Sequence, residues 1–478
     1  MEPIYDIAEP HAGALIESLR GFGYTIQTAI ADLIDNSITA GSNNIWLDFI
    51  WNSQNSFVRI RDDGTGMTEK ELINAMRPGS QNPLQSRARS DLGRFGLGLK
   101  TASFSQCRRL TVRSRKKSAP IVTRCWDLDY VAQTGQWRLL QSISPETEER
   151  LPPLTDIDHG TIVLWELMDR VVGEGRATDN KAQGRFLQII ADVEQHIRVV
   201  FHRFLDRPRR LRIYLNERLI EPWDPFLSQE PATQQLGEEV LSFEGEDIVV
   251  RPFVLPHHSK ITQGVHKEAA GPKGWNAHQG FYVYRNERLL IAGDWLGLPF
   301  VKEEHYKLAR IQVDIPNSMD HHWHIDVRKS KAQPPSVLRE DFKRIATLTR
   351  ERAASVYRYR GKVLAHSKSN GLIFPWHRIL KHGKIFYKVN LSYPLVGELL
   401  KLPQPFLGVF RSFIHLIEET VPIPLIAIDH AERAEQQSMP FEQTSPSEIY
   451  TVLLDVYRAL RQEGLSDIAA RERLLNTA

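Results

Sequence analysis

Cysteine is scarce in this chain, with two residues, Cys107 and Cys125, among 478. Two cysteines exclude a disulfide framework and a four-cysteine metal site, and they suit a reducing compartment. Long hydrophobic runs are missing, because no apolar stretch approaches the length of a membrane span. The first residues include the acids Glu2, Asp6 and Glu9 without an apolar run behind them, which is not the pattern of a signal peptide. We therefore expect a cytoplasmic protein that does not contact membranes.

A large net charge is also missing. The 61 lysines and arginines nearly balance the 58 aspartates and glutamates, for a net charge of +3. Any surface that binds nucleic acid must then be a local patch rather than a field over the whole molecule. At 478 residues, 41% of them hydrophobic, the chain is long enough for two or three domains with separate cores.

Three short motifs lie between residues 28 and 100, and the first is Asp32-Leu-Ile-Asp-Asn36. Apolar residues at helical spacing around it predict an amphipathic helix. Asp32 and Asn36 are four residues apart and therefore project from the same face of that helix. A carboxylate beside a carboxamide can hold a hard cation and polarise a water molecule.

The second motif, Asp62-Asp-Gly64-Thr-Gly66-Met67, follows a segment of alternating apolar and basic residues that predicts a strand. We expect this strand, 57–62, to form a hairpin with 45–51. The glycines allow a sharp turn where a Cβ atom would obstruct the chain. Aspartate and glycine are also common in plain turns, so this motif alone leaves both a binding site and a simple turn open.

The third motif, Gly93-Arg-Phe-Gly96-Leu-Gly98-Leu-Lys100, places three glycines ahead of a helical segment. Backbone amides at such a helix start favour phosphate binding. Two common nucleotide signatures are excluded. Leu99, not glycine, precedes Lys100, and the glycine spacing is wrong for Gly-x-Gly-x-x-Gly.

Together and in this order, the three motifs resemble those of the GHKL superfamily of Bergerat-fold ATPases, and most closely its prokaryotic MORC-like and MutL-like members. The resemblance implies ATP and Mg²⁺ as ligands, with Asn36 as the magnesium ligand and Asp62 as the residue that recognises adenine. It also implies roles in nucleotide binding for Gly64, Gly66, Met67, Gly93, Gly96, Gly98, Lys100 and Thr161. The hydroxyl of this threonine usually supports the adenine-binding aspartate, and residues 77–98 would form an ATP lid.

Asp32 departs from the usual pattern, which has glutamate at this position. Aspartate is one methylene shorter, so its carboxylate reaches water less directly. This departure puts the rate of hydrolysis in question but not nucleotide binding. For Asp35 the sequence leaves two interpretations, a second partner behind the site or a solvated acid.

The implied fold is α+β. It comprises a Bergerat α/β sandwich, a mixed sheet with helices on one face, at 1–180, an S5-like transducer domain at 185–338 and a mainly helical region at 339–478. In relatives a transducer lysine reaches the γ-phosphate, and the matching pattern gives Lys331 this catalytic role, with Lys329 as the alternative.

The resemblance implies an ATPase that works as an ATP-gated, dimerising clamp, acting on DNA in restriction or phage defence with other defence or chromatin-type proteins as partners. Two alternatives stay open. One is a chaperone-like remodeller whose clamp holds protein, and the other is a nucleotide-dependent scaffold with negligible hydrolysis.

Overall fold

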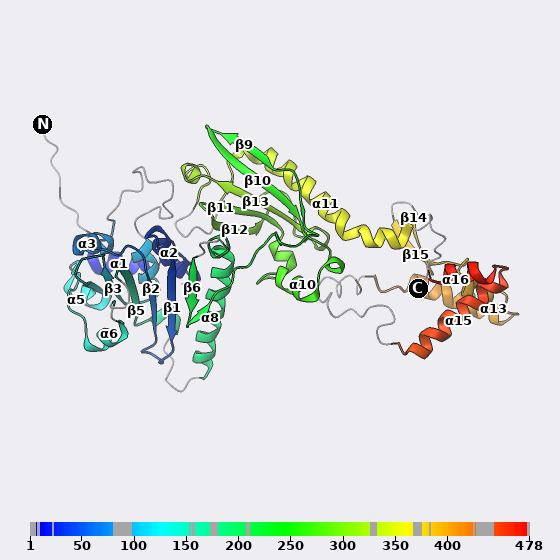
Figure 1. The fold of residues 1–478 in the computed structure, drawn as a ribbon, viewed down its shortest axis with the longest axis horizontal. Helices are drawn as coiled ribbons and strands as arrows, with labels where there is room; N and C mark the ends of the chain where they lie inside the picture. Colours follow the sequence, from blue (N-terminus) through cyan, green and yellow to red (C-terminus); the bar gives the residue numbers. More distant parts are fainter. Residues whose placement is uncertain are drawn as a thin grey trace. The chain divides into compact units, whose positions relative to one another are not determined.

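The computed structural model describes the chain except residues 1–5, 7–9, 22, 80–97, 153, 155–157, 173–179, 207–210, 326–331, 367–374, 382–383, 424–425, 427–443 and 476–478. The chain is an α+β protein that divides into two compact units, 1–353 and 354–478. The first unit contains two mixed sheets, and the second is mainly helical (Figure 1).

The first sheet has the strand order β4-β3-β5-β2-β1-β6-β7. Its strands are β1 (Asn44–Ile50), β2 (Phe57–Asp62), β3 (Arg109–Arg115), β4 (Val122–Asp127), β5 (Gly160–Glu166), β6 (Arg212–Leu215) and β7 (Arg218–Leu219). Neighbouring strands are antiparallel except β1 and β6, which are parallel. The hairpin expected from 45–51 and 57–62 is confirmed, with Ile45 opposite Asp62.

Helices pack their apolar residues with one face of this sheet in a continuous core. The helices of this region are α1 (Ala12–Arg20), α2 (Ile26–Thr39), α3 (Glu69–Met76), α4 (Gly98–Phe104), α5 (Leu128–Thr134), α6 (Pro145–Arg150), α7 (Asp169–Val172), α8 (Asn180–Val200) and α9 (His202–Leu205). Strand β5 serves both faces, since Val163 and Trp165 join this core while Ile162 and Leu164 join a smaller cluster with Leu151. This alternation follows from the two-residue period of a strand.

The second sheet has the order β12-β11-β13-β10-β8, with β9 paired to β10. Its strands are β8 (Gln234–Gln235), β9 (Glu239–Phe243), β10 (Glu246–Val254), β11 (Gly280–Arg285), β12 (Arg288–Asp294) and β13 (Ala309–Ile315). Helix α10 (Gln263–Ala269) and the start of α11 (Arg339–His366) accompany it. Phe342 of α11 is fully buried and packs edge-on against Phe281 and Trp323.

The second unit contains a two-stranded hairpin and helices around a small core that includes Val456, Leu460 and Ala470. Its elements are β14 (Trp376–Lys381), β15 (Lys384–Val389), α12 (Pro394–Leu399), α13 (Phe406–Glu419), α15 (Pro446–Gln462) and α16 (Asp467–Leu475). Among the described residues, no helix combines the length and apolarity that crossing a membrane requires.

Residues 180–219, most of which the sequence assigned to the second domain, contribute α8, β6 and β7 to the first sheet and its core. Phe186 on α8 is buried against Phe49 and Trp51, which lie at the end of β1. The three-part division at 180 and 338 stays a prediction, although the first sheet clearly extends beyond residue 180.

If α8 belongs to the core of the first sheet, Phe186→Ala should lower the free energy of unfolding by about 3–5 kcal/mol, because it removes a buried aromatic side chain. Leu187, the next residue, is 57% exposed, so Leu187→Ala is the matched control and should change stability by less than about 0.5 kcal/mol. Denaturant unfolding of both variants measures the difference. Equal effects would contradict this placement of α8.

Candidate functional site

Helix α2 supplies the first group of candidate site residues. It begins at a capping box in which Thr25 and Thr28 satisfy each other's backbone amides. Asp32 is buried, and the Tyr24 hydroxyl donates to its Oδ2 at 2.8 Å. Asn36, one turn further along the same face, is exposed. The Asp32 carboxylate is therefore held in place inside the protein, and the Asn36 carboxamide remains open to a ligand.

Asp62 lies at the end of β2 and is also buried. Ser37 of α2 donates to its Oδ2 at 3.0 Å, and the Gly64 amide donates to its Oδ1 at 2.9 Å. Burial raises the pKa of the Asp62 carboxyl, while the hydrogen bonds from Gly64, Ser37 and the Thr161 backbone oppose that rise. The Ser37–Asp62 bond joins the first motif to the second.

The glycines of the second motif are required by close contacts. A Cβ atom on Gly64 would lie 2.7 Å from Ser42 Oγ and 2.8 Å from Ala40 Cβ. Gly66 has φ +68°, and a Cβ atom there would lie 1.8 Å from the Arg115 carbonyl oxygen. The turn after Asp62 is therefore pressed against neighbouring chain segments, and a side chain larger than hydrogen would displace them.

Met67 and Thr161 both form hydrogen bonds with the hydroxyl group of Ser114 on β3. The Met67 amide donates to Ser114 Oγ at 2.9 Å, and the Thr161 hydroxyl lies 2.9 Å from the same oxygen. The resemblance implied that the Thr161 hydroxyl supports the aspartate. In the structure the Ser37 hydroxyl donates to Asp62, and the Thr161 hydroxyl bonds to Ser114. Register places Thr161 opposite both Asp62 and Ser114.

The third motif is described from Gly98 onward, so Gly93 and Gly96 lie outside the described residues. Gly98 begins α4 beside Asp32, since a Cβ atom on it would lie 3.6 Å from Asp32 Oδ2. Lys100 is 3% exposed, and its Nζ donates to the Ala75 carbonyl at 2.9 Å. Burial lowers the pKa of Lys100 to about 8. Lys331 and Lys329 also lie outside the described residues.

Sequence reasoning missed two partners of the α2 carboxylates, Tyr24 and Arg288. Asp35 is 1% exposed and pairs with Arg288, so the interpretation of Asp35 as a solvated acid is wrong. Arg288 lies on the second sheet, 253 residues along the chain, and no sequence pattern links the two positions. Tyr24 and Asp32 are eight residues apart. The sequence shows that an aromatic residue precedes the helix cap, but it does not show that its hydroxyl binds Asp32.

The donors that surround the site suit ATP and Mg²⁺. A carboxylate has about four lone-pair sites, so Asp62 can still accept an amino proton from a base beside its hydrogen bonds from Gly64, Ser37 and the Thr161 backbone. The exposed carboxamide of Asn36 offers the oxygen that Mg²⁺ prefers. The described residues contain no group of three or more His, Cys, Asp or Glu suited to a metal ion. Mg²⁺ usually keeps several waters and binds through few protein groups together with substrate phosphates, which suits a single carboxamide such as that of Asn36.

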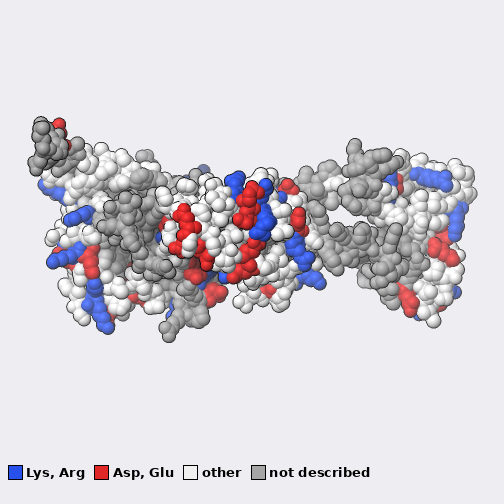
Figure 2. Space-filling view, turned by 90° about the horizontal axis from the view of Figure 1, so that it is seen from above, with Lys and Arg blue, Asp and Glu red and all other residues white. Residues whose placement is uncertain are grey.

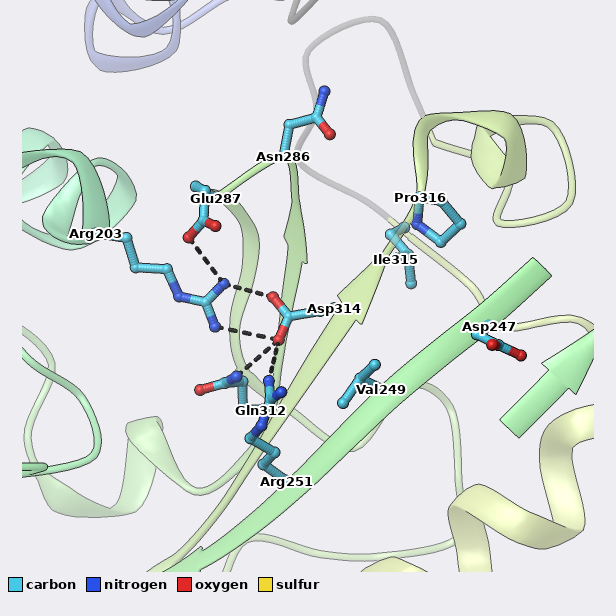
Figure 3. Close-up of a pocket in the computed structure, with 10 residues that line it drawn as sticks. All are labelled: Arg203, Asp247, Val249, Arg251, Asn286, Glu287, Gln312, Asp314, Ile315 and Pro316. Carbon is cyan, nitrogen blue, oxygen red and sulfur yellow. Dashed lines mark hydrogen bonds and ion pairs between the residues drawn. The ribbon is translucent and has the colours of Figure 1, made fainter. Parts of the chain in front are cut away.

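A polar cavity of about 660 Å³ lies on the second sheet. Figure 3 shows Arg203, Arg251 and Gln312 converging on Asp314, with Glu287 also bound to Arg203. Its basic side chains are thus occupied by acids of the same cavity or its rim. This arrangement stabilises the surrounding strands and offers a ligand little uncompensated charge.

Comparison with known proteins points to an ATPase. Residues 24–161 match the family described as "Histidine kinase-, DNA gyrase B-, and HSP90-like ATPase". A stretch of 89 residues, 19% of this chain, is 33% identical to "ATPase morc-1" of Caenorhabditis elegans, of which it spans 10%. The resemblance to the GHKL superfamily is therefore confirmed for residues 24–161, which contain all three motifs, and the resemblance to MORC proteins is confirmed over 89 residues.

The buried Lys100 predicts a rise in stability at alkaline pH. Its pKa is about 8 in the fold and 10.5 ordinarily, so between these values the unfolded chain binds a proton that the native chain does not. Stability should then rise with pH across this window, by about 3 kcal/mol from this residue alone.

Chemical denaturation at pH 7.5 and at pH 10 measures this rise, and Lys100→Met is the comparison, because methionine has similar length and no charge. The rise should be smaller in Lys100→Met than in the natural chain. Equal slopes in the two proteins would mean that Lys100 is solvated.

Proposed function

Since residues 24–161 form a domain of the histidine kinase-, DNA gyrase B- and HSP90-like ATPase family, we propose that this chain binds ATP there with Mg²⁺ and hydrolyses it. The observation that carries the proposal is the buried carboxylate of Asp62, held by Ser37 and by the amide of Gly64 at the end of β2. A carboxylate so placed accepts the amino group of adenine. Gly64 and Gly66 would support this site by letting the turn after Asp62 pack closely against Ser42, Ala40 and Arg115.

The proposed hydrolysis depends on Asp32 and Asn36, which lie one helical turn apart on α2. Mg²⁺, when bound, neutralises the charge that develops on the phosphates. Asn36 would hold this ion through its carboxamide oxygen. Asp32 would orient the attacking water, and its Oδ2 is already fixed by the Tyr24 hydroxyl. Asp32 thus has one oxygen anchored, which restricts the directions in which the shorter aspartate can present the other.

Phosphate binding falls to the third motif in this proposal. Gly93, Gly96 and Gly98 would approach the phosphates through their amides, and Lys100 would contribute its ammonium group. Lys100 is engaged by the Ala75 carbonyl at the end of α3, so it would exchange this partner for phosphate. Its lowered pKa makes that exchange favourable, because a phosphate stabilises the charged form that burial disfavours.

We further propose that ATP closes a homodimeric clamp, with Lys331 sensing the γ-phosphate, and Lys329 as the alternative, from an S5-like second domain. An ammonium on a flexible stem is well suited to a phosphate as a mobile point charge. The similarity to "ATPase morc-1" supports the ATPase part of this proposal. The resemblance to MORC and MutL proteins implies the rest, a clamp on DNA in a restriction or defence role with further protein partners. A protein-holding remodeller and a scaffold with negligible hydrolysis are the alternatives.

The surface charge of the described residues does not favour DNA over protein as the clamped molecule, so an experiment must distinguish the two. On the face shown in Figure 2, basic and acidic side chains of the described residues lie interspersed. On α11, for example, Arg344 pairs with Glu239 of β9 and lies near Asp341. Charges neutralised in this way contribute little to DNA binding.

Asp62→Asn should abolish tight ATP binding, because the amide can present a donor where the adenine amino group also donates, at a cost of about 1–3 kcal/mol. Burial raises the pKa of Asp62, so the buried carboxylate costs stability at neutral pH. The variant without nucleotide should therefore unfold at the same temperature as the natural chain or higher.

Calorimetric titration with MgATP measures the affinity, and Asp48→Asn on the neighbouring strand β1 is the matched control that should bind normally. Unchanged ATP affinity in a folded Asp62→Asn chain would refute the assignment of the adenine site.

A clamp on DNA predicts binding that requires a non-hydrolysable ATP analogue and weakens steeply with salt, because each phosphate contact releases a counterion. Filter binding of duplex DNA over a salt series, with the analogue and with ADP, gives the slope directly. A steep slope with the analogue alone supports the DNA clamp. Absence of binding at low salt would favour the protein client instead.

A further inference from the structure

The turn between β11 and β12 carries two arginines that bind different acidic side chains. Its central residues, Asn286 and Glu287, have φ of 47° and 69°, the pattern of the tightest two-residue hairpins. Arg285 and Arg288 flank the turn and pair across the two strands. Two guanidinium groups so near each other need separate acidic partners, and each has one.

Arg288 reaches the helix that carries the candidate site. Its Nε donates to both carboxylate oxygens of Asp35, at 2.8 and 2.7 Å. The side chains are 4% and 1% exposed, so the pair is closed to water. Asp35 immediately precedes Asn36 and follows Asp32 by three residues on α2. The second sheet is therefore tied to α2 within the turn of helix that would hold the magnesium ligand.

The hairpin that offers Arg288 is itself held firmly. Arg203 of α9 binds Asp314 and lies 3.4 Å from Glu287 (Figure 3). Its guanidinium also stacks over the Tyr284 ring. On the other side of the turn, Arg285 binds Asp320 at 2.7 Å. The hairpin that carries Arg288 is therefore fixed in position, and the Arg288–Asp35 pair fixes α2 relative to this hairpin.

We propose that Arg288 is a positioning residue for the nucleotide site: by fixing Asp35 it sets where α2 presents Asp32 and Asn36. This inference rests on the ATPase function proposed above. Loss of either partner removes one charge of a buried ion pair, which is strongly destabilising and favours a shift of the helix or the entry of water. Displacement by 1 Å is enough to slow a positioned reaction by about a hundredfold.

The alternative is that the pair contributes to stability and to nothing else. Three variants of the full chain separate the two roles. Arg288→Lys keeps the charge but loses the Nε–H group that spans the carboxylate. Arg285→Lys is the matched control, because it makes the same change on the same hairpin, toward Asp320, without touching α2. Asp35→Leu/Arg288→Met removes both charges together and should recover stability, as replacing buried ion pairs with apolar residues often does.

Thermal unfolding, ADP affinity and steady-state ATP hydrolysis are measured for each chain. We expect Arg288→Lys to lower kcat at least tenfold with ADP affinity within about threefold, and Arg285→Lys to change kcat less than twofold. The double variant should recover the unfolding temperature but not kcat. Recovery of kcat together with stability, or equal losses in the two lysine variants, would overturn the positioning role.

Amide hydrogen exchange of residues 31–37 without nucleotide gives a readout that does not depend on ATP hydrolysis. Exchange in this segment should be faster in Arg288→Lys than in Arg285→Lys, and equal rates would overturn the inference. If the natural chain neither binds nor hydrolyses ATP, the proposed function fails, and the exchange comparison still decides whether Arg288 holds α2.

Discussion

The burial of polar side chains on α2 is the constraint on which the rest of the first unit depends. Asp32, Asp35 and Ser37 are each at most 5% exposed, and a buried polar group is costly unless it has a partner. The partners come from three places: Tyr24 before the helix, Arg288 on β12 and Asp62 on β2. One helix therefore fixes the chain before it, the first sheet and the second sheet at once.

These bonds also divide the work of a nucleotide site. The Ser37–Asp62 bond places the proposed adenine carboxylate relative to the helix, and the Tyr24–Asp32 bond orients the proposed hydrolytic carboxylate. Asn36, the exposed member of the group, is the one proposed to meet the metal ion. Buried members thus set geometry, and the exposed member is left to bind. Polar networks that are fully satisfied tend to specify a single arrangement in this way.

Lys100 follows a different logic from the aspartates. Its ammonium is buried with a carbonyl oxygen as acceptor, and burial lowers its pKa to about 8. Because burial disfavours the charged form of Lys100, a phosphate would stabilise this ammonium group more than it would stabilise a solvated lysine. In the proposed site, a phosphate would therefore compensate the buried charge of Lys100.

The sequence by itself determined several local elements and the resemblance to the ATPase family. Helical spacing placed Asp32 and Asn36 on one face, alternation predicted the β1–β2 hairpin, and the glycines of the second motif marked a turn too crowded for a side chain. These features depend on neighbours within a few residues, and local sterics and periodicity decide them. The three motifs in order also sufficed to indicate the ATPase family.

The tertiary structure alone decided which distant groups meet. Nothing near Asp35 in the sequence indicates that Arg288, 253 residues later, would neutralise it, or that α8 and β6 would complete the first sheet. The hydroxyl that donates to Asp62 belongs to Ser37, while the Thr161 hydroxyl bonds to Ser114, although strand register places Thr161 opposite both Asp62 and Ser114. Such pairings are set by how whole sheets and helices pack, and packing depends on many residues whose joint effect no short pattern records.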